Sequence, residues 1–315
     1  MYELLAEIKN LKKENLMGAN FLSNWALELL KNYILIKKEV PKWDNLQKVF
    51  NCIVEARPSM SALYTKLSYF LKKVSEVTDK DVNFTEFLIG ITGIHKEMNK
   101  IDEFGQKRIN DLLLEKIPDN SVILTHSYSS STVKALKYVI KNKENIKLIV
   151  TESRPMKEGR IVAKDLINLC PVTYIVDSSV GYWMNQNVVD VVVLGADSIL
   201  ASGDLVNKIG TYSLALFAKT LKIPFYSISS RWKLDVGEVS NGRKIEIAEK
   251  PAAEVWDHNI INDNLDVINY YFDITPGNLI TSYLTDFGEL KPSEIKDTVM
   301  KEFPIDWIKD NFKLE

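Results

Sequence analysis

The chain is poor in cysteine and histidine, and this limits its redox and metal chemistry. Among 315 residues there are two cysteines, Cys52 and Cys170, and three histidines. Each cysteine lies in an apolar stretch, which predicts buried free thiols in a reducing cytoplasm rather than a disulfide. His95 and His258 have no cysteine or histidine at ligand spacing, so we expect no zinc site or other metal site.

Neither an excess of one charge nor a long apolar run is found. Lys+Arg is 40 and Asp+Glu is 42, a balance that argues against a general nucleic-acid surface or a polybasic membrane anchor. No apolar run approaches transmembrane length. The charged opening stretch MYELLAEIKNLKKE has the pattern of an amphipathic helix rather than a signal peptide. We expect a soluble cytoplasmic protein without direct nucleic-acid or membrane contacts.

Glycine-rich cofactor motifs are also missing. The sequence has no P-loop pattern and no G-x-G-x-x-G after its first expected strand, which argues against an ordinary ATPase or nicotinamide enzyme, and we expect no cofactor. Long Gly/Ser linkers and internal repeats are absent as well. Hydrophobic residues make up 46% of the chain, enough for one large core with a smaller domain or for two domains of ordinary size.

Residues 1 to about 115 are predicted to form a helical N-terminal domain packed directly against the remainder. Apolar stripes at helical spacing open this part, and further helical segments follow over residues 46–56, 63–74 and 82–116. We expect the last of these to break near Gly90 and Gly93.

Residues 116–315 are predicted to form a Rossmann-like, doubly wound parallel sheet, which makes the fold class α/β. Runs of β-branched and aromatic residues without polar alternation are typical of strands buried on both faces of such a sheet. These runs are VILT (122–125), KLIVTES (147–153), VTYIVDSS (172–179), VVVLGAD (191–197) and PFYSISS (224–230). The later segment FDITP is predicted to be a strand that leads into a helix start.

Each of these five runs ends in a polar group. Because the carboxyl ends of the strands in a doubly wound sheet line one crevice, we expect these groups to converge on a single site. The groups are Thr125, Glu152, Asp177, Asp197 and Ser229.

Three features of this crevice suggest a site for a doubly phosphorylated or otherwise anionic small molecule. Asp197 is either a general acid or base with a raised pKa or the cap of the following turn. The run from Gly203 to Thr211 places Asn207 and Lys208 at an expected helix start, where unpaired N–H groups favour anions. The serines from Ser129 to Ser131 open another helix, as anion ligands or as simple N-caps.

Two more residues have open interpretations. His126 follows a strand end and is either catalytic or a hydrogen-bonded structural histidine. Arg57, before Pro58, either directs its guanidinium toward a phosphate or only marks the end of a helix.

Beyond these local patterns, the sequence resembles the translation initiation factor 2B α/β/δ family over roughly Gly18 to Gly288. The resemblance is carried by the runs ILTHSYSSSTV, VTESRPMKEGRIVAKDL, VVVLGADSIL, GDLVNKIGTYSLALFAK and PFYSISSRWKLD, with further landmarks ARPSMSALY, GQKRI, FDITP and LTDFG. That family includes isomerases of methylthioribose 1-phosphate and ribose 1,5-bisphosphate. It implies a helical N-terminal domain, a Rossmann-like domain and dimerisation through the latter.

The resemblance also implies the site residues. The family isomerases use a cysteine after a Thr-His pair and an aspartate in a Gly-Ala-Asp turn as proton acceptor and donor. The matching positions here are Ser127 and Asp197. The implied ligand contacts are Gly18, Ala19, Arg57, Ser129, Ser130, Ser131, Asn207, Lys208 and Lys233.

Two departures separate this chain from the isomerases it resembles. Ser127 replaces the cysteine, and a serine hydroxyl is a far weaker base than a thiol. Met17 replaces an arginine that reaches a substrate phosphate in the isomerases. A binding pocket without its base predicts a regulatory initiation factor 2B-like subunit, similar to archaeal members with Thr-His-Ser. Such a subunit would bind a sugar phosphate or nucleotide without turnover and contact initiation factor 2 subunits. The alternative is an aldose–ketose isomerase acting on ribose 1,5-bisphosphate or a related sugar 1-phosphate.

The arrangement of the whole molecule is the last expectation. We expect Ser129 and Asp197 to share one pocket. We also expect a homodimer or a larger assembly, formed mainly by the sheet domain, because exposed apolar faces of that size are uncommon in monomers.

Overall fold

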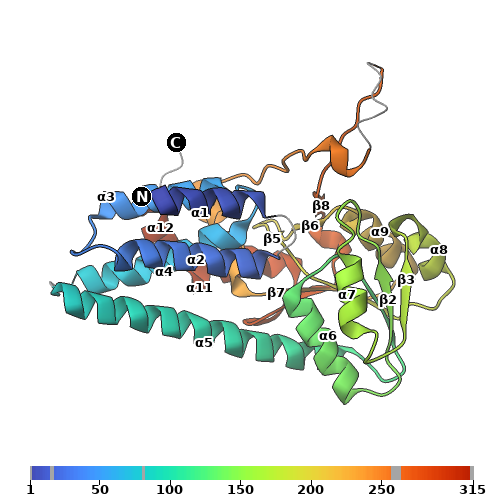
Figure 1. The fold of residues 1–315 in the computed structure, drawn as a ribbon. Helices are drawn as coiled ribbons and strands as arrows, with labels where there is room; N and C mark the ends of the chain where they lie inside the picture. Colours follow the sequence, from blue (N-terminus) through green and yellow to red (C-terminus); the bar gives the residue numbers. More distant parts are fainter. Residues whose placement is uncertain (1, 15–17, 80–81, 257–263, 313–315) are drawn as a thin grey trace.

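The computed structural model describes residues 2–14, 18–79, 82–256 and 264–312. Helices gather at one end of the molecule, and a sheet covered by further helices occupies the other (Figure 1). This arrangement confirms the predicted α/β class with a helical N-terminal region. Among the described residues, no helix is long and apolar enough to cross a membrane.

The N-terminal region consists of helices whose apolar faces meet in a common core. Their bounds are α1 (Tyr2–Lys13), α2 (Ala19–Leu35), α3 (Trp43–Glu55), α4 (Ser61–Thr78) and α5 (Phe84–Lys116).

Helix α3 shows how this burial works. Its face formed by Leu46, Val49 and Ile53 is buried, while Cys52 on another face is exposed. The predicted burial of Cys52 is therefore wrong, because helical periodicity turns it away from the apolar face. Cys170 is only half-buried, and both cysteines are free thiols.

Helix α5 runs without interruption for 33 residues, so the predicted break near Gly90 and Gly93 is wrong. A capping box between Asn83 and Glu86 begins the helix. Gly90 has a packing role, since a Cβ at this position would lie 2.9 Å from Cγ1 of Val77 on α4. The glycine allows these two helices to approach each other closely.

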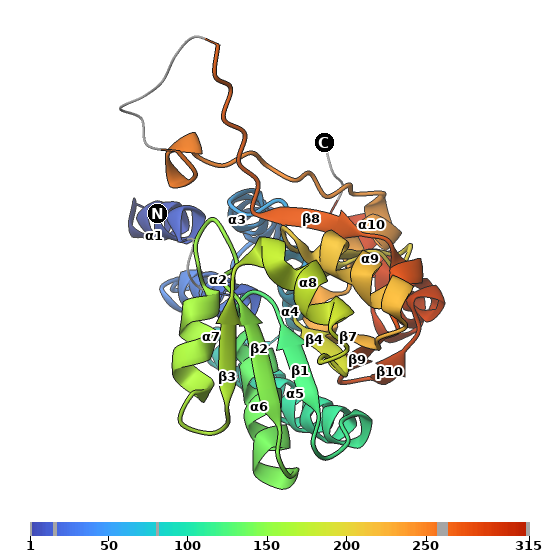
Figure 2. The same cartoon turned by 90° about the vertical axis from the view of Figure 1, so that its right-hand side faces the viewer.

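The main sheet has seven strands in the order β10-β9-β7-β4-β1-β2-β3 (Figure 2). All neighbours pair in parallel except β10, which is antiparallel to β9. The strands are β1 (Val122–Thr125), β2 (Lys147–Thr151), β3 (Val172–Ile175), β4 (Val191–Leu194), β7 (Phe225–Ser229), β9 (Ser282–Thr285) and β10 (Gly288–Leu290). The first five match the predicted runs, whereas β9 and β10 were not predicted.

Helices cover both faces of the sheet, and successive strand residues alternate between two apolar clusters. Ile123 and Val193 pack in the cluster with the end of α5, whereas Leu124 and Val192 belong to the cluster on the other face. The covering helices are α6 (Ser130–Asn142) and α7 (Gly159–Leu166) on the α5 side, and α8 (Val180–Asn185) and α9 (Thr211–Leu221) opposite. Edge strand β3 departs from the predicted double burial, since Tyr174 is exposed.

A second, three-stranded sheet lies outside the main one, in the order β5-β6-β8. Its strands are β5 (Ser198–Ile199), β6 (Leu205–Lys208) and β8 (Phe272–Thr275), all antiparallel. The predicted FDITP strand is therefore real but pairs with β6 instead of joining the parallel sheet.

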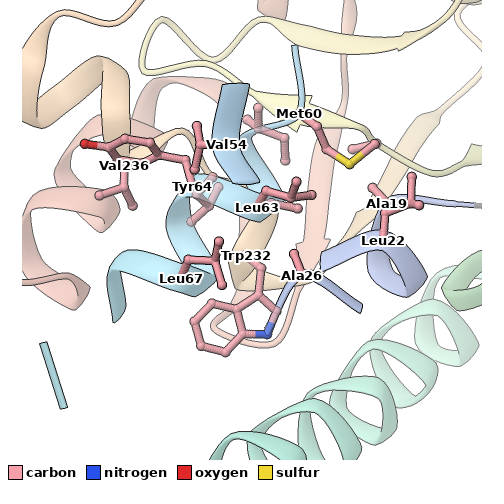
Figure 3. Packing of buried hydrophobic residues seen from close by; sticks show 14 of the residues in the cluster. Ala19, Leu22, Ala26, Val54, Met60, Leu63, Tyr64, Leu67, Trp232 and Val236 are labelled. Atoms are coloured by element: carbon pink, nitrogen blue, oxygen red, sulfur yellow. The ribbon is translucent and has the colours of Figure 1, made fainter. Parts of the chain in front are cut away.

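The C-terminal helices return to the helical region. Helix α10 (Val236–Asn241) follows β7, and α11 (Ile295–Glu302) and α12 (Ile305–Asn311) follow β10. Phe312 stacks on Phe50 of α3. One continuous core joins the helices to the sheet, with Trp232 packed among residues of α2 and α4 (Figure 3). The division into domains at residue 115 stays a prediction.

Candidate active site

The candidate site lies at the point where the winding of the sheet reverses. Strand β1 lies between β2 and β4, so the connections leaving β1 and β4 run in opposite directions across the sheet. In doubly wound sheets, ligands bind beyond the carboxyl ends of the strands at this position. Ser127 and Ser129 follow β1, and Asp197 follows β4.

A narrow crevice brings most of the predicted site residues together. A cavity of about 60 Å³ is lined by Arg57, Ser127, Glu158 and Lys208, and we call it the Arg57 half. A smaller space of about 10 Å³ forms the Lys233 half. Both halves share Gly18 and Asp197. The Lys233 half is also lined by Ala19, Ser129, Ser130, Asn207 and Lys233.

Ser131 lies outside the crevice. It lines an adjoining cavity of about 290 Å³ between the N-terminal helices and α6, and its hydroxyl accepts a hydrogen bond from Asn20 Nδ2 at 2.8 Å. Met17, whose identity separates the chain from the isomerases, and His258 lie outside the described residues.

Asp197 is the carboxyl that the two halves have in common. Its enclosed position raises its pKa, while the ammonium groups of Lys233 and Lys208 oppose the shift. The alternative was that Asp197 caps the following turn. Its carboxyl makes no side-chain hydrogen bond with the described part of the chain, so this role is not supported. The carboxyl therefore retains its proton to higher pH than an exposed aspartate does.

The start of α6 lies directly against the turn that carries Asp197. A Cβ on Gly195 would lie 2.6 Å from Cβ of Ser129, so only glycine allows this approach. The Ser129 hydroxyl accepts from the amide of Thr132 at 3.3 Å and caps the helix. The predicted N-cap is thus present, and the first-turn amides of Ser130 and Ser131 remain the donors that a helix start offers to an anion.

Lys233 is held in the crevice wall by a buried polar network. Its side chain is 4% exposed, and its Nζ donates to the carbonyl oxygen of Ala196. Burial lowers the Lys233 pKa, against the attraction of Asp197. The adjacent Trp232 donates through Nε1 to Asp102 at 2.5 Å, and Asp102 also binds Lys66 at 2.6 Å. These contacts anchor the short 3-10 turn (Arg231–Lys233) against α4 and α5.

Glu158 is a site residue that the sequence analysis missed. Its Oε1 lies 2.9 Å from Lys208 Nζ and accepts a hydrogen bond from the Ser127 hydroxyl at 3.3 Å. Lys208 also lies over the ring of Tyr271 at 4.7 Å. Glu158 belongs to the quoted run VTESRPMKEGRIVAKDL, but nothing in its local pattern identifies it as a partner of Ser127.

Arg57 marks the end of a helix, as one of its two interpretations expected, and it also lines the crevice. It follows the end of α3, and its Nε donates to the carbonyl oxygen of Leu11 at 2.9 Å. Its Nη2 is buried without a hydrogen-bond partner among the described residues. An unpaired guanidinium nitrogen beside the crevice is a donor available to an anionic ligand.

The predicted anion site at the start of α9 is wrong. The amides of Gly210 and Tyr212 both donate to Asp273 Oδ2, at 2.7 and 3.2 Å. The helix start is therefore already occupied by a carboxylate of the chain itself. Asn207 and Lys208 belong instead to β6, which presents them to the crevice.

The strand-end groups do not all converge. Among them only Asp197 lines the crevice. Asp177 accepts from the amides of Ser153 and Arg154, both at 2.7 Å, and Glu152 pairs with Arg160 at 3.3 Å. Thr125 and Ser229 are buried and do not line the crevice either.

Of the two alternatives for His126, the structure supports the hydrogen-bonded structural histidine. Its ring nitrogens contact Thr151 Oγ1 at 2.6 Å and the carbonyl oxygen of Ile209 at 3.0 Å. Burial lowers its pKa, which keeps the ring neutral. Both nitrogens are engaged, so neither faces a ligand.

A sequence model described as the initiation factor 2 subunit family matches residues 15–292. The chain belongs to this family. It is 32% identical to the ribose 1,5-bisphosphate isomerase of Methanocaldococcus jannaschii, over 92% of this chain and 91% of that one. It is 33% identical to the methylthioribose-1-phosphate isomerase of Carboxydothermus hydrogenoformans, over 82% and 78% of the two chains.

Solved structures show the same fold. The translation initiation factor eIF-2B of Pyrococcus horikoshii aligns with a TM-score of 0.75 at 24% identity, covering 92% of this chain and 97% of that one. The 5-methylthioribose 1-phosphate isomerase of the same organism aligns at 0.72 and 26% identity, covering 95% and 88%. Relatives that match most of this chain at about this identity are named as isomerases. This contradicts the prediction of a regulatory subunit without turnover.

Proposed function

We propose that this family member is an aldose–ketose isomerase that acts on a phosphorylated pentose. The observation that carries the proposal is the position of Asp197, a carboxyl with a raised pKa that lies between two groups of anion-binding residues. Isomerisation moves protons within one sugar, and a carboxyl whose pKa is raised by burial suits the donor role. We assign this role to Asp197.

The two halves of the crevice suit a substrate with a phosphate at each end. The Lys233 half offers an ammonium group and the first-turn amides of α6, and the Arg57 half offers Arg57 and Lys208. Ribose 1,5-bisphosphate, which relatives of this chain are named for, has this charge distribution.

One observation favours a second substrate. The Arg57 half also contains apolar side chains, those of Leu22, Met60 and Phe272. Such a surface would accept the methylthio group of methylthioribose 1-phosphate, for which other relatives are named.

The test is a turnover assay with both sugars, following ketose formation by wild type and by Asp197→Asn. We expect wild type to convert ribose 1,5-bisphosphate with the larger kcat/KM. Asp197→Asn should lose about 10²–10⁴-fold in kcat, the range for removal of a general acid, while still binding the sugar in calorimetry. Absence of turnover with both sugars would refute the proposal.

We also propose a homodimer. Large apolar side chains are exposed on the neighbouring elements α8, α9 and β8, namely Tyr182, Leu216, Phe217 and Ile274, and exposed apolar patches mark protein interfaces. A role in translation initiation and a contact with initiation factor 2 stay predictions from the family resemblance.

A further inference from the structure

Ser127 is a poor proton acceptor by itself, because an unassisted hydroxyl ionises far above neutral pH. An isomerase needs a base as well as the acid that Asp197 supplies. The nearest base to Ser127 is Glu158, whose Oε1 accepts its hydrogen bond at 3.3 Å. Both residues line the Arg57 half together with Asp197 and Lys208.

The surroundings of Glu158 differ from those of a structural ion pair. The residue is 8% exposed, and its Oε1 contacts both Lys208 and Ser127. Its Oε2 is buried without a partner among the described residues. A buried carboxylate oxygen without a donor costs free energy, and a cost of this kind at the wall of a crevice points to a substrate group as the missing partner.

The backbone around Glu158 is closely packed against the sheet. A Cβ on the next residue, Gly159, would lie 1.8 Å from the carbonyl oxygen of Thr151, so the loop is pressed against the end of β2. The amides of Lys157 and Gly159 donate to the carbonyl oxygens of Ser153 and Glu152, at 2.9 and 3.2 Å. This backbone and the contacts of Oε1 with Lys208 and Ser127 position the carboxylate, and such preorganisation favours proton transfer.

From this geometry we propose that Glu158 is the catalytic base of the isomerisation and that Ser127 is a positioning residue that donates a hydrogen bond to it. The proposal rests on the isomerase function proposed above. The resemblance placed the proton acceptor at position 127. In this proposal the Glu158 carboxylate moves the proton instead, and the Ser127 hydroxyl orients that carboxylate.

The chemistry balances within the substrate and the two carboxyls. Glu158 takes the proton from C2 of the cyclic sugar 1-phosphate, and the electron pair forms a C1–C2 double bond. The bond between C1 and the ring oxygen breaks, and Asp197 donates a proton to that oxygen. Glu158 then returns its proton to C1, while the C2 hydroxyl passes its proton to Asp197 and becomes the ketone. Lys208, next to Glu158, lies where it can offset negative charge on the intermediate.

The experiment compares full-length wild type with Glu158→Gln, Glu158→Asp, Ser127→Ala and the control Glu152→Gln. Glu152 belongs to the same strand-end segment but pairs with Arg160 outside the crevice. We expect Glu158→Gln to lose about 10²–10⁴-fold in kcat with near-normal sugar binding. Glu158→Asp should keep part of the activity. Ser127→Ala should lose about tenfold or less, and Glu152→Gln should match wild type.

Reaction in deuterium oxide gives a second readout that a structural role would not affect. Wild type should place solvent deuterium at C1 of the ketose, because the Glu158 proton exchanges with solvent before its return. Glu158→Gln should slow product formation and exchange at C2 together. An active wild type whose Glu158→Gln variant stays within tenfold, or still exchanges the C2 proton at the wild-type rate, would overturn the role of Glu158 alone. An inactive wild type would overturn the isomerase function together with this proposal.

Discussion

The guanidinium of Arg57 is tethered on one side and unpaired on the other, which makes its role separable by mutation. Its Nε donates to Leu11, and its Nη2 has no partner among the described residues. We expect Arg57→Met to raise KM for ribose 1,5-bisphosphate by one to two orders of magnitude, because a charge-assisted hydrogen bond contributes about 1.5–3 kcal/mol. Arg57→Lys should recover part of the loss by restoring the charge. Steady-state kinetics measure the effect, and an unchanged KM in Arg57→Met would place the phosphate elsewhere.

Asp273 makes the stability of the protein depend on pH in a defined direction. Burial raises its pKa to about 6, although the amides of Tyr212 and Gly210 oppose the shift. In the unfolded chain the same carboxyl titrates near about 3.9, so between these values the native state binds more protons than the unfolded state. The stabilisation from this carboxyl is therefore complete below about pH 4 and is lost as pH rises through about 6.

Asp273→Asn tests this because the amide cannot ionise but can still accept a hydrogen bond from the start of α9. The free energy of unfolding of wild type minus that of the variant should fall between about pH 4 and pH 6 and stay level above about pH 7. The total change should be on the order of 3 kcal/mol, because each unit of pKa difference corresponds to about 1.4 kcal/mol. Urea denaturation at several pH values measures it, and a difference that does not vary with pH would contradict the raised pKa.

At the scale of single residues, the sequence revealed the groups that stand in recognisable runs and missed those selected by tertiary contact. Asp197, Ser129 and Lys233 were identified from the residues or from the resemblance, and the structure brings them to one crevice. Glu158 was missed because its partner Ser127 is 31 residues away in the chain. Asp273 reaches the amide of Gly210 across 63 residues, and no local pattern predicts that this carboxylate occupies a helix start.

At the scale of elements, two glycines in α5 form a matched pair. Gly93 has open space at its Cβ position, whereas a Cβ on Gly90 would meet Cγ1 of Val77 at 2.9 Å. We expect Gly93→Ala to stabilise the protein by about 0.5–1 kcal/mol through helix propensity. Gly90→Ala should gain nothing or destabilise by about 1 kcal/mol or more, because overpacking against the stiff valine opposes the same gain. The measurement is the thermal unfolding temperature of each variant relative to wild type. Equal stabilisation by both would show that α4 can move away from α5 at little cost.

The predictions of helices and strands were right where the apolar pattern was strong. They were wrong where a contact with another element determines the local structure. The five buried runs became β1, β2, β3, β4 and β7, and the helical stripes became α1 to α5. Gly90 was taken for a breaker, yet packing against α4 keeps it inside a continuous helix. The strands β9 and β10 were not predicted. Strand β6 was taken for a helix start because its pairing with β8 is not local.

For the whole molecule, the sequence predicted the α/β class but not how its two ends are joined. The C-terminal helices were assigned with the sheet, whereas they pack on the N-terminal helices, as the stacked rings of Phe50 and Phe312 show, 4.1 Å apart between centroids. The network of Lys66, Asp102 and Trp232 then ties helices to the turn that carries Lys233. The crevice thus depends on both parts, and we expect neither part alone to bind the sugar.

Helices α8 and α9 expose large apolar side chains, and these carry the last expectation. Tyr182 is 66% exposed, and Leu216 and Phe217 on the neighbouring helix are also exposed. Water contact of these side chains is unfavourable, so burial against a second copy would stabilise a symmetric dimer. We expect light scattering at micromolar concentration to give about twice the chain mass of 36.0 kDa.

Leu216→Glu should shift the protein toward monomer, because it places a charge in an apolar interface. Ile89→Glu, at a position 68% exposed on α5, should leave the mass unchanged. A wild-type monomer would refute the dimer. Equal behaviour of the two variants would place the dimer interface elsewhere.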